Sequence, residues 1–154
     1  MSNFGNAPAG RNVDSITFLA HVAAGVPGIT PTGLIEGAVA VNPLDGSCDD
    51  NQAVLPGAAA AKGVLGVVTD HYGSDGPVEG KPLSVRYLGL VGINIEANTA
   101  VTFGDKLIVA NAQGDAKPWT NEADCDIVAI AMQSLVAQPA RGRILCRLQP
   151  QYQK

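Results

Sequence analysis

The segment VTFGDKLIVANAQG (residues 101–114) places a short apolar run between two groups of turn-forming residues. The run KLIVA has the character of a buried strand. Gly104 and Asp105 precede the run, Asn111 and Gly114 follow it, and all four belong to residue types that favour turns. None of the residues in this segment is suited to act as a nucleophile at neutral pH, and no histidine lies near Asp105 in the sequence. The segment therefore predicts a strand between two turns rather than a reactive site.

Apolar runs bounded by turn residues recur along the rest of the chain. The expected strands cover residues 15–25, 37–41, 63–68, 83–95, 106–110, 126–132 and 142–148. Only PGAAAAKG (56–63) and NEAD (121–124) have helical character, and each is too short to form a stable helix alone. Turns are frequent, because the 154 residues include 18 glycines and 10 prolines. The sequence predicts an all-β fold of the small β-barrel or β-sandwich type.

A degenerate internal repeat supports this fold class. VNPLDG (41–46) aligns without gaps on VANAQG (109–114), and GVLGVV (63–68) aligns on DIVAIA (126–131). LSVRY (83–87) then matches ILCRL (144–148), which places Val85 on Cys146 and Arg86 on Arg147. The same elements thus occur twice in the same order, and the turn residues of the first segment belong to this repeat.

The composition indicates one weakly charged globular domain. Charged residues make up 16% of the chain, against roughly 25% in an average soluble domain. The net charge of −4 argues against a nucleic-acid partner, because phosphate binding requires clustered Lys and Arg. No apolar run reaches the roughly 18 residues of a membrane span, so no membrane partner is expected. The three cysteines have neither CxxC spacing nor an even count, which favours a reducing compartment.

The first residues form a segment apart from the repeated pattern. Residues 1–14 are polar and interrupted by glycine and proline, so they predict an extended arm, followed by a single β-barrel domain over residues 15–154. The arm carries one apolar anchor, Phe4, and one basic residue, Arg11. Both are candidates for contact with another subunit or with a larger assembly.

Motifs that would indicate catalysis or metal binding are incomplete. GPVEGK (76–81) has three residues between its glycines, whereas a phosphate-binding loop has four, so a hairpin turn is expected. DHYGSDG (70–76) places His71 between two aspartates without further ligands, and Asp45, Asp49 and Asp50 predict a solvated acidic loop. Cys48 lies among acids, which disfavour a thiolate. We expect no catalytic residues, no metal and no cofactor.

Three arginines near the end of the chain share one face of the last expected strand. Arg141, Arg143 and Arg147 have the same parity, so their side chains are expected on one side of the strand. One interpretation is a solvated outer face. The other is pairing with carboxylates across a subunit or capsid contact, where the guanidinium group can bind in a bidentate manner.

The order of elements from Gly37 to Leu148 resembles the small capsid decoration, or cement, proteins of tailed bacteriophages. The matching elements are GVLGVV, GKPLSV, LVGI, AVTFGDKLIV, the turn that ends in Gly114, and GRILCRL. The sequence departs from the pattern in the long loop 69–80 and in Ala129, where a glycine is usual.

This resemblance implies a small β-barrel that forms a homotrimer and binds the major capsid protein. It implies a structural, non-enzymatic role on the outer capsid surface of the virion, with synthesis in the host cytoplasm. The alternative is a carbohydrate- or surface-binding module, such as a head-fibre base. Modules of that kind display exposed aromatic residues, and this chain has few.

Overall fold

The computed structural model describes residues 14–22, 30–72 and 74–153, and for residues 149–153 it describes the backbone alone. These described residues form ten strands and no helix. The strands are β1 (Ser15–Ala20), β2 (Val39–Val41), β3 (Gln52–Ala53), β4 (Val64–His71), β5 (Pro82–Arg86), β6 (Gly89–Ile95), β7 (Lys106–Val109), β8 (Ala116–Pro118), β9 (Cys125–Ala131) and β10 (Gly142–Gln153). The predicted all-β fold is confirmed. Within the same residues, no helix has the length and hydropathy needed to cross a membrane.

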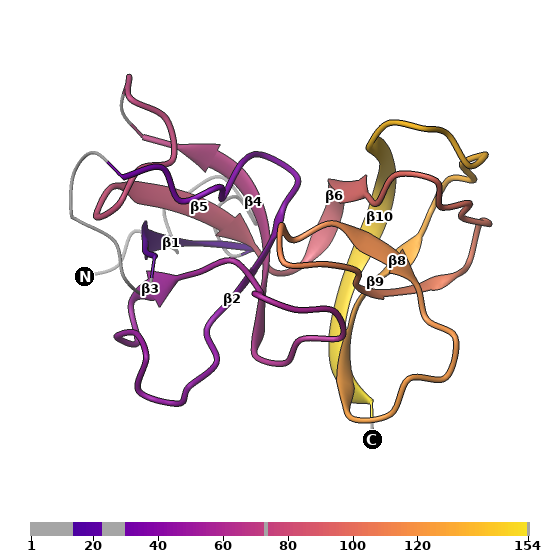
Figure 1. The fold of residues 1–154 in the computed structure, drawn as a ribbon, viewed down its shortest axis with the longest axis horizontal. Coiled ribbons are helices and arrows are strands. Elements are labelled where there is room, and N and C mark those ends of the chain that lie inside the picture. The colour runs from indigo at the N-terminus through magenta and orange to yellow at the C-terminus, as the bar shows by residue number, and fades with distance from the viewer. Residues whose placement is uncertain (1–13, 23–29, 73, 154) are drawn as a thin grey trace, which may run out of the picture.

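The strands form two five-stranded units that lie side by side (Figure 1). The first unit has the strand order β2-β4-β5-β1-β3, and the second is a closed barrel with the order β10-β6-β8-β7-β9. In the first unit, a single bridge between Val41 and Val54 joins β2 to the residue after β3, so this sheet is nearly closed as well. The β-barrel expected over residues 15–154 thus consists of two small units.

The two units have the same topology, which confirms the internal repeat. Each contains one parallel pair, β1 with β3 and β6 with β8, and the remaining strand pairs are antiparallel. Val85 of β5 pairs with Val68 of β4, and Cys146 of β10 pairs with Ala131 of β9. The ungapped alignments of 63–68 on 126–131 and of 83–87 on 144–148 therefore describe equivalent registers.

The repeat extends to strands that the sequence alignment did not include. Val85 also pairs with Ile16 of β1, and Cys146 also pairs with Val91 of β6, so β1 corresponds to β6. The expected single strand over residues 83–95 is wrong, because β5 belongs to the first unit and β6 to the second. Strand β6 begins at Gly89, which has a φ of +89° that glycine adopts without a steric cost.

Other expected boundaries also differ from the structure. The strand expected over 15–25 ends at Ala20, and residues 23–25 lie outside the described residues. The stretches 56–63 and 121–124 form turns and bends instead of helical turns. The short strands β3 and β8 were not predicted, and β10 continues beyond residue 148 to Gln153.

Apolar packing joins the two units. The interior of the first contains Ala20, Ala40, Val68, Leu83 and Val85. The interior of the second forms one larger apolar cluster that also includes two residues of the first unit, Val39 and Val67, which point away from their own sheet interior. Backbone hydrogen bonds cross the same junction, including one from Val39 N to Gly114 O (2.8 Å) and one from Asn94 N to Gly37 O (2.9 Å).

Candidate functional site

The outer surface of β6 and β10 carries the arginines that the sequence analysis singled out. Leu90 of β6 lies opposite Arg147 of β10, and Gly92 lies opposite Leu145. We call these four residues and Arg143 the β6–β10 face. Leu90 is 50% exposed and Leu145 is 39% exposed. Residues of the opposite parity on β10 are buried in the barrel: Ile144, Cys146 and Leu148. The alternation predicted for the last strand is therefore confirmed.

The three arginines have different partners. Arg141 Nε lies 2.7 Å from Oδ1 of the buried Asp115, and Arg143 Nη2 lies 2.9 Å from Oε1 of Glu36. Glu36 precedes β2, so the second contact connects the two units. Arg147 forms no ion pair with any residue that the structure describes. Of the three side chains, Arg147 therefore retains a guanidinium group that can pair with a carboxylate of another molecule.

A missing side chain at Gly92 shapes the β6–β10 face. A Cβ atom at this position would lie 2.6 Å from Arg143 Nε, too close for a stable contact. The guanidinium group of Arg143 therefore lies across Gly92, directed toward Glu36. Leu90, Leu145 and Arg147 remain as the projecting groups of this face. Phe4 and Arg11, the other two candidate contact residues, lie outside the described residues.

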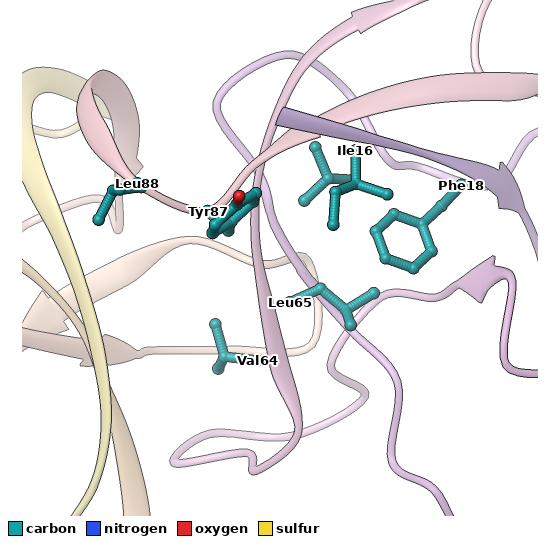
Figure 2. A pocket seen from close by; sticks show the side chains of 7 residues that line it. Ile16, Phe18, Val64, Leu65, Tyr87 and Leu88 are labelled. Carbon is teal, nitrogen blue, oxygen red and sulfur yellow. The ribbon is translucent and has the colours of Figure 1, made fainter. Parts of the chain in front are cut away.

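An apolar groove at the junction of the two units is a second candidate site, which the sequence analysis did not predict (Figure 2). Its volume is about 450 Å³. We call it the junction groove, and the residues that line it are Ile16, Phe18, Val64, Leu65, Val85, Tyr87 and Leu88. Ile16 and Leu88 are each about half exposed, at 51% and 53%. The available sequence signal was the spacing of Ile16 and Phe18, which places both side chains on one face of β1.

The cysteines have environments that oppose thiolate formation. Burial raises the pKa of the Cys146 thiol to about 12, and burial also raises the pKa of Cys125. The pKa of Cys48 is raised by partial burial and by the neighbouring carboxylates, among them Asp45 and Asp49. A cysteine nucleophile needs a lowered pKa. These three thiols therefore lack the activation that nucleophilic catalysis requires.

His21 and the buried Glu79 hold structural positions. His21 Nδ1 lies 2.6 Å from Oε1 of the buried Glu79, whose Oε2 accepts a hydrogen bond from Val22 N at 2.6 Å. Glu79 lies in GPVEGK, where Gly76 and Gly80 both have positive φ angles. The predicted turn is thus confirmed, and its carboxylate is used to hold the residues that follow β1. Within the described ranges, no three side chains of His, Cys, Asp or Glu gather as a metal site would require.

The single tryptophan is engaged in contacts within the chain. Trp119 Nε1 donates a hydrogen bond to Glu122 O at 2.8 Å, and the Lys106 ammonium group lies 5.3 Å from the ring centroid. The Trp119 side chain also packs against the buried cluster of Ile108, Cys125 and Ile127. A stacking platform for a sugar needs an accessible aromatic face, and Trp119 is poorly placed to provide one.

No protein-family model and no curated protein sequence matches this chain.

Proposed function

We propose that this chain is a structural protein that binds the outside of an assembled phage capsid and stabilises it. The observation that carries the proposal is the β6–β10 face, where Leu90, Leu145 and Arg147 project from a closed barrel. The resemblance of residues 37–148 to capsid decoration proteins supplies the partner, the major capsid protein. The proposal gives the chain a binding role on the outer surface of the virion, after synthesis in the host cytoplasm, and includes no cofactor and no reaction.

The composition of the β6–β10 face suits binding to another protein. Arginine is enriched at protein interfaces and among the few residues that contribute most of the affinity, and the buried centre of an interface is more apolar than its rim. The two leucines lie on adjacent paired strands, and Arg147 directly faces Leu90 across the pair. Because the backbone of a closed barrel is already ordered, binding through this face costs little additional conformational entropy.

Such a contact would stabilise the capsid by mass action. A ligand that binds one state preferentially shifts the equilibrium toward that state, by about 2.7 kcal/mol at a free concentration 100 times the Kd. A decoration protein that contacts neighbouring capsid subunits binds the assembled shell and not the separated subunits. Many copies on one shell would therefore resist the internal pressure of the packaged genome.

The proposal includes a homotrimer, which follows from the family resemblance. The 16% charged content is consistent with surface that self-association would cover. Sedimentation equilibrium at micromolar concentration should give a mass about three times the 15.7 kDa of one chain. A stable monomer in the absence of capsid would contradict this part of the proposal.

The alternative role, a carbohydrate- or surface-binding module, has weaker support. Trp119 has its indole packed within the chain, as described above. Among the described aromatic residues, the two with large exposed fractions are Tyr72 (47%) and Phe103 (62%), and they belong to different units. No pair of neighbouring exposed rings is available in the described residues to stack on a sugar.

Co-sedimentation with expanded capsids of the phage that encodes this chain tests the proposed function. We expect the unmodified protein to sediment with the capsids. Leu90→Ser and Arg147→Glu should each weaken binding about tenfold or more, the loss that corresponds to about 1.4 kcal/mol at an interface centre. Val136→Ser is the matched control, because Val136 is 84% exposed and lies outside the β6–β10 face. Absence of binding by the unmodified protein would refute the function, and unchanged binding of both face variants would refute the role of the face.

The N-terminal arm is tested separately in the same assay. Phe4 and Arg11 remain candidate capsid contacts, so a chain that begins at Val13 should fold but bind capsids more weakly. Unchanged capsid affinity of this deletion would remove the arm from the proposed contact and leave the β6–β10 face.

A further inference from the structure

The junction groove is the counterpart of a region that is fully closed in the second unit. The strand registers, extended by the ungapped alignments of 63–68 on 126–131 and of 83–87 on 144–148, make four residues that line the groove equivalent to interior residues of the closed barrel. The equivalent positions are Ile16 and Val91, Phe18 and Ile93, Leu65 and Val128, and Tyr87 and Leu148. In the second unit all four are buried, with exposed fractions of 7% or less, whereas Ile16 is 51% exposed. The groove is therefore an uncovered part of a barrel interior.

The interior of the second unit is covered by chain that precedes its first strand. Val39 and Val67 belong to the same apolar cluster as Val91 and Leu148, and Ala61 packs against this cluster. Strand β4, which contains Val67, contacts β6, β9 and β10 (Figure 1). In chain order, β4 comes before β6, the first strand of the unit that it covers.

Residues 1–13 precede Asp14, the described residue before β1, and Asp14 lies beside the groove. Tyr87 N donates a hydrogen bond to Asp14 O at 2.9 Å, and the Asp14 carboxylate lies 3.5 Å from Arg86 Nη1. Tyr87 is itself a residue of the groove (Figure 2). Asp14 lies ten positions after Phe4 in the chain, and ten fully extended steps span at most about 33–36 Å. Phe4 can therefore reach any part of the groove in its own chain.

A second copy of the chain is a poorer occupant. Val39 pairs with Val67 in the first unit, and the equivalent pair in the second unit is Lys106 with Ile130. If a second molecule covered the groove with Lys106 and Ile130, as Val39 and Val67 cover the second unit, it would bring Lys106 into an apolar surface. Burial of an unpaired ammonium group is strongly unfavourable.

We propose that residues 1–13 dock in the junction groove of their own chain, with Phe4 as the apolar anchor. The groove lining is apolar apart from the Tyr87 hydroxyl, and a phenylalanine ring buries about 150–250 Å² when it enters such a site. The contact concerns the free protein and does not depend on the proposed capsid-binding function; for Phe4 to contact the capsid, the arm would have to leave the groove. It completes the first unit in the way that β4 completes the second.

A double-mutant cycle between Phe4 and the groove tests the contact. Phe4→Ala should lower the Tm by about 2–4 °C, the shift typical of a modest apolar contact in a chain of this size. In an Ile16→Ser background, Phe4→Ala should lower the Tm clearly less, because the effects of substitutions at two residues in contact are not additive. Phe103→Ala is the matched control, because Phe103 is 62% exposed in the second unit. Its effect should be negligible and the same in both backgrounds. Additive effects of Phe4→Ala and Ile16→Ser would overturn the proposal.

Nuclear Overhauser effects give a test that does not depend on stability. In the full chain, we expect effects between the Phe4 ring and the methyl groups of Leu65. A sample that mixes isotopically labelled and unlabelled chains distinguishes contacts within one chain from contacts between chains. Effects within one chain support the proposal. Effects only between chains, or no effects between these groups, would overturn it.

Discussion

Gly66 of β4 occupies a position where the two units differ, and Gly66→Ala provides a sharp test of the fold. A Cβ atom at Gly66 would overlap the carbonyl oxygen of Arg86 on the neighbouring strand and lie 3.0 Å from Val85 Cγ1. Its φ of +153° is also one that residues with side chains rarely adopt. The equivalent residue in the second unit is Ala129, so the closed barrel has room for a methyl group at this point. We therefore expect Gly66→Ala to be strongly destabilising, although alanine is present at the equivalent position.

The magnitude can be separated into two contributions with Gly57→Ala as the control. Gly57 has a φ of +76° and no atom within 4 Å of the added Cβ, so Gly57→Ala carries only the backbone cost of about 1–2 kcal/mol. In Gly66→Ala the opposing atom belongs to the backbone, so a strand must shift, which adds about 1–3 kcal/mol. Since 1 kcal/mol changes Tm by about 2–4 °C in a chain of this size, Gly66→Ala should melt about 2–12 °C below Gly57→Ala.

Thermal unfolding followed by far-ultraviolet circular dichroism measures both variants under the same conditions. Equal melting temperatures for the two variants would refute the reasoning, because they would show that β4 and β5 do not approach as closely at Gly66 as the structure has them.

Three further predictions concern single side chains. Cys146→Ser should lower the free energy of unfolding by about 1–3 kcal/mol, because it buries a hydroxyl group without a good partner. Cys48→Ser should change the free energy of unfolding by no more than about 0.5 kcal/mol. Equal shifts in the melting temperature of the two variants would contradict the strand parity. Burial alone would raise the pKa of Glu122, but hydrogen bonds, chiefly from the Thr120 backbone, lower it to about 2 from a usual value of 4.5. The stabilisation from this carboxylate is therefore present above about pH 4.5 and is lost as the pH falls toward 2. In urea unfolding, the free energy of unfolding should fall less between pH 5 and pH 3 for Glu122→Gln than for the unmodified protein. Identical decreases for the two proteins would exclude this contribution of Glu122. Arg143→Ala should change stability by less than about 1 kcal/mol in urea unfolding, because its ion pair is exposed; a larger loss would show that this contact holds the two units together.

Local patterns in the sequence determined the fold class and the repeat. Strand formation and turn formation depend on residues close together in the chain, so alternation in GRILCRL and the glycines of GPVEGK were sufficient to predict an exposed arginine face and a hairpin turn. The repeat also contained register information, because equivalent strands must place equivalent residues in the barrel interior. The alignment of Val85 on Cys146 is consistent with their equivalent pairs in the structure, Val85 with Val68 and Cys146 with Ala131.

Tertiary structure decided which of these patterned residues are covered. Ile16 and Val91 occupy equivalent positions and are both apolar, yet Ile16 is 51% exposed and Val91 is 7% exposed. The difference arises because β4 of the first unit packs over the second barrel, a contact that neither residue's local sequence specifies. The pairing of Arg143 with Glu36, 107 residues away, depends in the same way on how the units meet. Exposure and partner choice depend on the surfaces that surround a residue. The sequence pattern therefore defined the strands and their exposed sides, whereas the packing of the two units left the junction groove open and paired Arg143 with Glu36.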